Sequence, residues 1–185
     1  MQLKHPGLME KAKNLIMAAI TGPANGVSVT ADIVTEIIAT TLKDSGLSVV
    51  FSVTEAIDDV VSGAICGTIQ VAGDLQQAAT GIMIGVVRGT KKIGTESLES
   101  IIHTAQVMIR ETSAGGGDLV AATTGLIDGA IAGAIEAGLS SEDAAMAAAD
   151  GALKAAGLAG ADIADLVHPA VTNVAQHVKM VLNHK

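Results

Sequence analysis

A 22-residue repeat constrains the fold of this chain more than any other feature of its sequence. Five positions spaced 22 residues apart carry an acidic or hydroxyl side chain, and each follows a glycine by one or two residues: Asp74, Glu96, Asp118, Ser140 and Asp162. With a five-residue insertion at 49–53, the chain divides into eight units that begin near residues 5, 27, 54, 76, 98, 120, 142 and 164. A period of this length is typical of helical-repeat proteins, in which each unit buries its apolar face only against its neighbours.

The junction between two units has the composition of a helix end followed by a helix start. Glycine readily adopts the left-handed conformation that ends a helix, and an Asp or Ser side chain after it can accept backbone N–H bonds from the next helix. Each unit then forms one helix of roughly 16–19 residues, and links this short favour antiparallel neighbours. We predict four helix N-caps at these junctions: Asp74, Asp118, Ser140 and Asp162.

These junctions predict an all-α fold of about eight short antiparallel helices, closely packed as a bundle or a solenoid, in a single domain over residues 1–185. A competing interpretation is one long helix in a right-handed supercoil, because 22 is twice the 11-residue period of such helices. Glycine at the junctions favours separate helices. The most strand-like segment is 48–53, which we interpret as a loop or a helix start.

Glycines also recur every four residues inside three of the units, so they lie on one face of each expected helix. A glycine in a helix interior costs about 1 kcal/mol relative to alanine, so a row of them needs a compensating gain. We predict Gly-xxx-Gly contacts in which helices approach closely, through Gly63, Gly67, Gly81, Gly85, Gly89, Gly125, Gly129 and Gly133. Larger residues two positions further on, such as Ile65, Val87 and Ile127, lie on the opposite face and let helices nest on both sides.

The composition excludes several classes of function. The chain has a formal charge of −8, and Phe51 is its only aromatic residue, so we expect no binding to nucleic acid. Cys66 is the only cysteine, which rules out a disulfide within the chain, and we expect it to be buried and inert. Mean hydropathy is +0.50, but the longest charge-free stretch, 14–31, contains the helix-breaking run 22–26. We therefore expect a cytoplasmic protein that is not an integral membrane protein.

Few residues have a spacing that suggests chemistry. Asp165 and His168 are three residues apart and share a helix face, and together with His177 they are the candidates for a metal site. No HExxH or Glu-x-x-His pair occurs, so we expect no metal and no cofactor. Arg88, Lys91 and Lys92 form the only basic cluster, which we interpret as a solvated face. The sequence supports no catalytic constellation, and we expect no enzyme.

Two segments, 132–145 and 151–157, are rich in alanine and glycine and resemble bacterial Ala/Gly-rich helical-repeat proteins of unassigned function. In composition, most of the chain is also similar to phasins and perilipin-type coat proteins, whose helical repeats contain few aromatic residues and lie on polymer or lipid surfaces. The resemblance implies an apolar or lipid surface as a partner, and it implies no functional residues. The sequence departs from the coat-protein pattern at 120–141, where Asp128 and Glu136 are the only charges and no broad charged face exists.

Three functional hypotheses follow. The first is a non-catalytic helical scaffold that self-associates as a homo-oligomer, because short apolar helices leave more apolar surface than one chain can cover. The second is a coat protein that binds an apolar inclusion or a membrane surface. The third is a carrier that holds a small ligand or a metal ion between helices.

Overall fold

Helices account for the secondary structure of the part of the chain that the structure describes, which comprises residues 6–22, 26–44, 53–95 and 97–182. The computed structural model has no strand in these ranges, which confirms the all-α prediction. The helices are α1 (Pro6–Thr21), α2 (Gly26–Asp44), α3 (Val53–Gln70), α4 (Leu75–Lys92), α5 (Ser97–Ala114), α6 (Leu119–Ala137), α7 (Ser141–Ala159) and α8 (Ala161–Leu182). Val53 begins α3, and the rest of the 48–53 segment lies outside the described residues, as does Glu96.

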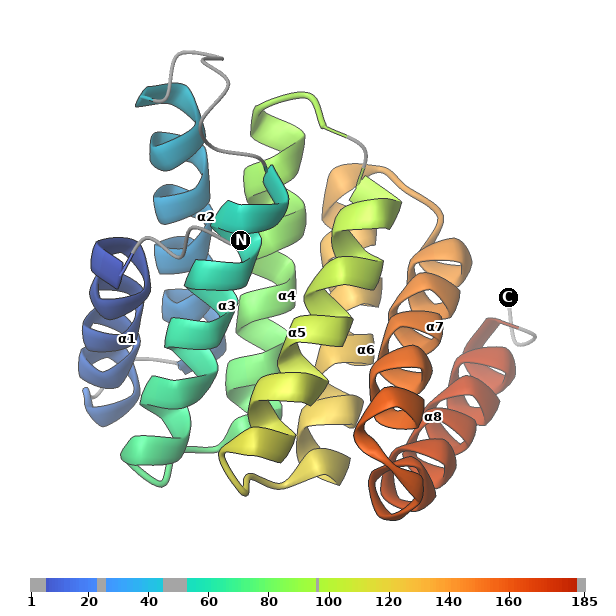
Figure 1. Cartoon of the computed structure of the whole chain (residues 1–185). Helices are drawn as coiled ribbons and strands as arrows, with labels where there is room; N and C mark the ends of the chain where they lie inside the picture. Colours follow the sequence, from blue (N-terminus) through green and yellow to red (C-terminus); the bar gives the residue numbers. More distant parts are fainter. Residues whose placement is uncertain (1–5, 23–25, 45–52, 96, 183–185) are drawn as a thin grey trace.

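The chain reverses direction at the junctions, which excludes one continuous helix (Figure 1). Gly94, Gly116 and Gly138 have φ values of 74°, 68° and 71°, as expected for residues that end a helix in the left-handed region. The non-glycine residue Ala72 adopts the same conformation, with φ of 49°. The glycine that follows it, Gly73, is needed for space instead, because a Cβ there would lie 2.8 Å from Cγ2 of Ile20.

Three of the four predicted N-caps begin their helices. Oδ1 of Asp74 accepts a hydrogen bond from the backbone N–H of Gln77, and Oδ1 of Asp118 accepts two from Val120 and Ala121. The prediction for Asp162 is wrong. Helix α8 already begins at Ala161, so Asp162 lies within its first turn. The link is shorter there because Gly160 alone joins the helices: its N–H bonds to the carbonyl of Ala156 and its carbonyl accepts from Ala164.

The third cap is Ser140, whose Oγ accepts a hydrogen bond from the backbone N–H of Asp143 at 3.2 Å. A serine cap leaves the acidic side chains of the first turn of α7, Glu142 and Asp143, uninvolved in capping. Both acidic residues are exposed and lie at the positive end of the helix dipole.

The helices form two layers. We call α1, α3, α5 and α7 the odd layer, and α2, α4, α6 and α8 the even layer. Consecutive helices run in opposite directions and alternate between the layers (Figure 1), so neighbours within one layer are parallel. The most extensive contacts join helices two apart in the chain, namely α4 with α6, α2 with α4, α1 with α3 and α5 with α7. The arrangement is a two-layer helical solenoid, in which α1 to α7 pack mainly on helices two away in the chain, whereas α8 contacts α7 slightly more than α6.

The rows of glycine explain which pairs of helices have the closest backbones. Each predicted glycine lies against the helix two before its own: those of α3 against α1, those of α4 against α2 and those of α6 against α4. A Cβ at Gly85 would lie 2.7 Å from the carbonyl oxygen of Ala31, and one at Gly129 would lie 2.6 Å from that of Thr80. Gly151 of α7 meets the backbone of Ile102 in α5 in the same way, a contact that the sequence reasoning missed.

Two threonines link the backbones of neighbouring parallel helices. Oγ1 of Thr35 donates to the carbonyl of Gly85 at 3.2 Å, and Oγ1 of Thr80 donates to that of Gly125 at 3.1 Å. As the nesting prediction requires, the larger residues of one helix lie against the glycines of another. A Cβ at Gly133 of α6, for example, would meet Cβ of Val87 in α4 at 3.1 Å. A bulky ridge of one helix therefore fits the glycine face of the next.

A continuous hydrophobic core runs between the layers, from Ala12 in α1 to Val171 in α8. Its residues are mainly alanine, valine, isoleucine and leucine with two methionines, because close backbones leave little room for larger side chains. Among the described helices, α6 alone is long and apolar enough to cross a membrane, and 56% of its most apolar window is buried inside the protein. A core helix of a packed helical protein has the same properties, so α6 is weak evidence for a membrane span.

Candidate functional site

A polar cluster lies between α3 and α5. Oδ1 of Asp58 is 3.3 Å from Nε2 of His103 and 3.4 Å from a terminal guanidinium nitrogen of Arg110, which also pairs with Glu111 at 3.0 Å. Asp58 and His103 are mostly buried, whereas Arg110 is half exposed. When His103 is protonated, its positive charge and that of Arg110 are both opposite to the charge of Asp58. The cluster then stabilises the contact between α3 and α5, a helix pair that has no glycine contact.

Burial alone would raise the pKa of Asp58. The contacts of Asp58 with His103, at 3.3 Å, and with the guanidinium of Arg110 outweigh burial and hold the pKa of Asp58 below its ordinary value. The carboxylate is therefore ionised at neutral pH and is occupied by its two partners. This environment suits a structural ion pair better than a general acid, which would need a raised pKa.

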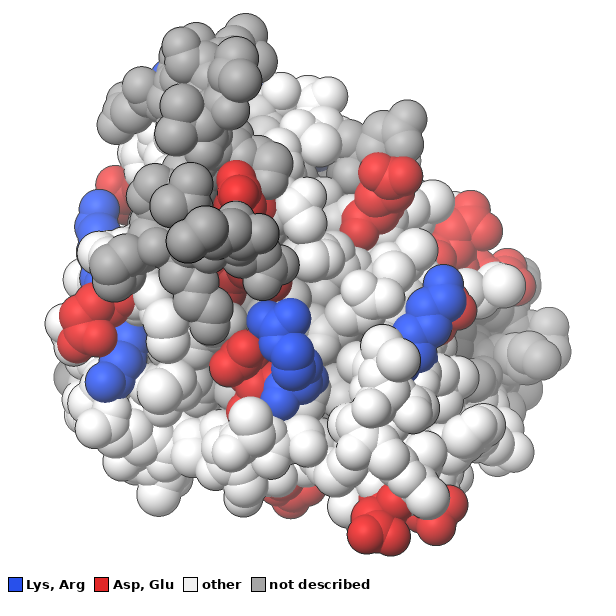
Figure 2. Space-filling view, in the orientation of Figure 1, with Lys and Arg blue, Asp and Glu red and all other residues white. Residues whose placement is uncertain are grey.

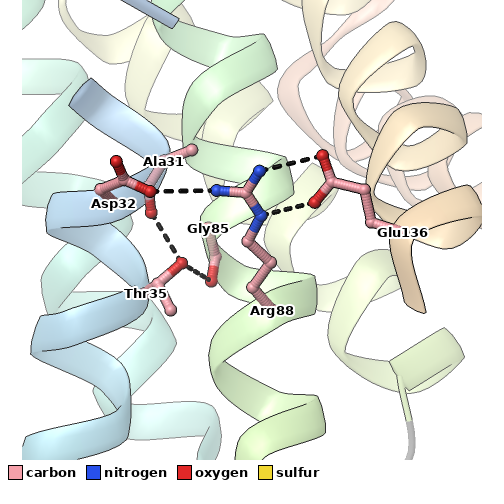
Figure 3. A network of polar contacts seen from close by, with 6 residues as sticks. All are labelled: Ala31, Asp32, Thr35, Gly85, Arg88 and Glu136. Atoms are coloured by element: carbon pink, nitrogen blue, oxygen red, sulfur yellow. Dashed lines mark hydrogen bonds and ion pairs between the residues drawn. The ribbon is translucent and has the colours of Figure 1, made fainter. Parts of the chain in front are cut away.

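A second polar network crosses three helices of the even layer, with Arg88 of α4 at its centre (Figure 3). The guanidinium donates two hydrogen bonds to the carboxylate of Glu136 in α6, one through Nε and one, 2.9 Å long, through a terminal nitrogen. A third bond of 3.1 Å reaches Oδ1 of Asp32 in α2. Arg88 therefore joins α2, α4 and α6 on the outer face of the layer.

This network is more exposed than the cluster at Asp58, since 71% of the Asp32 side chain is accessible to solvent. The hydrogen bonds from Arg88 lower the pKa of Glu136 below its ordinary value, against a smaller opposing effect of burial. The same bonds raise the pKa of Arg88. The network contributes little to stability at high salt because it is solvated.

The residues around Arg88 line a shallow open trough of about 470 Å³. Its lining is Asp32, Thr35, Arg88, Lys91, Lys92, Glu136 and Ala137. Nζ of Lys91 donates to the carbonyl of Ala137 at 2.6 Å, which ties the last turn of α4 to the last turn of α6. The interpretation of the basic cluster as a merely solvated face is therefore incomplete, because Arg88 and Lys91 both bond to other helices.

Three exposed apolar residues lie in or near the α6–α7 turn in the chain. Ile135 is 66% exposed and Met146 is 64% exposed, and Leu139 lies in the turn between them. The equivalent residue 44 positions earlier, Ile102 of α5, is half buried, and its backbone meets Gly151 of α7; no odd-layer helix among the described residues packs on α7 in the same way. We call Ile135, Leu139 and Met146 the turn patch.

The metal candidates do not form a described site. Asp165 and His168 are exposed residues of α8, and the side chain of His177 lies outside the described residues. No three histidine, cysteine or acidic side chains come together as possible ligands in the described part of the chain. The expectation that Cys66 is buried is wrong, because the thiol is exposed.

Sequence reasoning missed both ion-pair networks. The pairs that join different helices are 45 to 56 residues apart in the chain, so no local motif contains them. The signal that could have found them is the spacing of two repeat units, 44 residues, which brings Asp58 and His103 to similar heights on neighbouring parallel helices.

Comparison with known proteins supports the fold and gives no family. No protein-family model matches the chain, and no curated protein matches it. A crystal structure of the de novo designed helical repeat protein DHR7 is similar, with a TM-score of 0.58 over 96% of each chain and 15% sequence identity. At this identity the match concerns the fold alone. The resemblance to phasins and perilipin-type proteins stays a prediction, and the chain has a helical-repeat fold.

Proposed function

We propose that this protein is a non-catalytic helical-repeat scaffold that self-associates through the end of the solenoid formed by α6, α7 and α8. The turn patch carries this proposal, because the repeat covers the position equivalent to Met146 elsewhere and leaves Met146 itself uncovered. A second copy of the chain supplies the apolar cover that the repeat supplies inside the solenoid.

The distribution of exposed apolar side chains supports this location. Large exposed hydrophobic residues are concentrated in the last third of the described chain, at Ile135, Leu139, Met146, Leu158 and Leu166. Leu15, Leu98 and Val120 are spread over the rest. Full burial of one such side chain is worth about 1.5–3 kcal/mol, so covering two or three of them offsets a substantial part of the entropic cost of association.

The surface charge also favours association. Figure 2 shows that charged side chains on the face built by α3, α5 and α7 stand in small separate groups with uncharged surface between them. Only 16% of the residues are charged. A second copy can approach such a surface with little desolvation of charged groups.

The test is the molar mass of the protein in solution, measured by light scattering after size exclusion over a dilution series. We expect a mass above that of the monomer at micromolar concentration, and a shift to the monomer in Met146→Lys. Leu15→Lys is the matched control, because Leu15 is an exposed apolar residue of α1 at the opposite end of the solenoid and is 40% exposed. A wild-type protein that is monomeric throughout the series, or equal effects of both substitutions, would contradict the proposal.

A further inference from the structure

A hollow of about 390 Å³ lies where α1 and α3 end and α2 and α4 begin. Its apolar walls include Ile20 at the end of α1, Val71 at the α3–α4 turn and Ala78 in the first turn of α4. One water molecule occupies about 30 Å³ in the liquid, and pockets for small molecules begin at about 300 Å³. The hollow therefore has room for a small organic ligand.

The hollow coincides with a gap in the repeat. Helices α2, α4 and α6 begin at the equivalent residues Gly26, Leu75 and Leu119, and Gly26 lines the hollow. Both leucines are buried, and Cδ1 of Leu75 would lie 2.9 Å from a Cβ at Gly117 in the α5–α6 turn. In the α3–α4 turn the residue equivalent to Gly117 is Gly73, and Gly26 has no side chain that could reach it. The hollow is the space that a leucine fills in the next repeat.

A buried hydroxyl in the wall of the hollow has no hydrogen-bond partner. Thr30 is the fifth residue of α2 and is fully buried, and its Oγ1 makes no hydrogen bond to the described part of the chain. The equivalent residue of α6, Thr123, donates from Oγ1 to the carbonyl of Leu119 at 2.6 Å. A buried polar group without a partner destabilises a protein, so the hydroxyl of Thr30 marks a place where a bound molecule completes the bonding.

The hollow also carries a negative charge. Asp74 lines it and accepts two hydrogen bonds of 3.0 Å from Gln77, one from the backbone N–H and one from Nε2. A carboxylate can accept about four hydrogen bonds, so Asp74 keeps free acceptor positions. Among the described residues, no lysine, arginine or histidine lines the hollow. Helix starts and helix ends border it together, so their dipoles oppose each other and Asp74 decides the sign of the charge.

The carboxylate and the buried hydroxyl lie on the same side of the hollow. Oε1 of Gln77, whose Nε2 bonds to Asp74, would lie 3.5 Å from a Cβ at Gly26. Thr30 follows Gly26 by four residues and so lies on the same face of α2, one turn further into the protein.

We propose that the hollow binds a small aliphatic amine in its protonated form. The ammonium group donates hydrogen bonds to Asp74 and to Oγ1 of Thr30, which gives the buried hydroxyl a partner. The aliphatic part takes the place of the missing leucine side chain, against Ile20, Val71 and Ala78. The inference does not depend on self-association, and it adds a ligand site to the scaffold.

The test is a titration of the full-length protein with n-butylamine at neutral pH, followed by the amide chemical shifts in NMR spectra. We expect saturable shifts at Gly26, Thr30 and Ala78. The control ligand is n-butyrate, which has the same number of carbons and the opposite charge, and we expect it to bind at least about tenfold more weakly because it meets Asp74 as a like charge. Equal binding of the two ligands, or no saturable shift with butylamine, would overturn the inference.

Three variants test the three parts of the site. Gly26→Leu restores the leucine of the repeat, and we expect it to abolish butylamine binding and to raise the urea midpoint because the side chain fills the hollow. Thr30→Val removes the hydroxyl, and Asp74→Asn removes the charge but keeps a side chain that caps a helix equally well. Each should weaken binding about tenfold. The matched control is Thr123→Val, the same substitution at the equivalent residue of α6, which should leave binding unchanged.

Circular dichroism shows whether each variant folds. Gly26→Ala replaces Gly26→Leu if the larger side chain prevents folding, since a Cβ at Gly26 meets only Oε1 of Gln77 within 4 Å. It should weaken binding without abolishing it. Butylamine binding that is unchanged in the folded variants at Gly26, Thr30 and Asp74, or weakened equally by Thr123→Val, would place the amine elsewhere and overturn the inference.

Discussion

Helix α6 packs on α4 through glycine, whereas α5 packs on α3 through side chains. The glycine positions of α3, Gly63 and Gly67, correspond one double repeat later to Val107 and Glu111 of α5. The contact between α3 and α5 is accordingly less extensive than that between α4 and α6, and the Asp58 cluster lies in it. The same repeat therefore supports two kinds of interface, one that depends on backbone approach and one that depends on polar side chains.

This difference indicates which interactions stabilise each interface. Between α4 and α6, dispersion contacts of the backbone and a hydrogen bond from Thr80 to the carbonyl of Gly125 hold the pair. Between α3 and α5, the mostly buried carboxylate of Asp58 must stay paired, because an unpaired buried charge destabilises the fold. Substitutions should therefore act through steric overlap in the first interface and through charge in the second.

The largest effect should come from Gly129→Ala. The new Cβ would lie 2.6 Å from the carbonyl oxygen of Thr80 and 2.9 Å from Cβ of Met83, so the helices must separate. We expect a loss of about 2–3 kcal/mol in the free energy of unfolding, measured by urea denaturation. The matched control is Gly157→Ala in α7, where no atom lies within 4 Å and a gain of up to about 1 kcal/mol is expected from helix propensity. If Gly129→Ala left the free energy of unfolding unchanged, the α4–α6 interface would not depend on close backbone approach, and the contrast with the α3–α5 interface would be wrong.

A smaller effect is expected from Asp58→Asn, which leaves His103 and Arg110 without their carboxylate. We expect a loss of about 1–2 kcal/mol at neutral pH. Because the pKa of Asp58 is lower in the folded than in the unfolded state, its stabilisation is present above the ordinary carboxyl pKa and is lost as pH falls through the folded value. Urea midpoints between about pH 7 and pH 2 should converge for the wild type and the variant. A constant difference over this range would show that the charge of Asp58 is irrelevant to the α3–α5 interface.

The smallest effect should come from Arg88→Gln. Arg88 joins three helices, but Asp32 and Glu136 are well solvated, and the glycine contacts of α4 and α6 remain. We expect a loss of about 0.5–1 kcal/mol at low salt that nearly disappears at about 1 M NaCl. The measurement is urea denaturation at both salt concentrations. A loss larger than that of Asp58→Asn would mean that charge, and not backbone approach, holds the even layer together.

Much of the fold could be predicted from the repeat. Helices α2 to α7 begin one residue before the predicted unit starts, because the glycine and cap chemistry of the junction is local. The start of α8 is three residues from its prediction, since Gly160 alone forms that link. Less of the candidate site could be predicted from the sequence: the metal candidates do not come together among the described residues, and Cys66 is exposed. Arg88 was noticed only as part of a basic cluster, because its partners are far away in the chain.

The sequence by itself determined the number of helices, the places where they end and the face of each that glycine keeps thin, because these depend on neighbouring residues and on helical periodicity. Only the tertiary structure decided that each glycine face meets the parallel helix two units before it. A periodic pattern identifies a face of a helix but does not say which helix lies opposite. The same holds for the pairing of Asp58 with His103 and of Arg88 with Glu136, and for the exposure of Met146, since each depends on the stacking of whole helices.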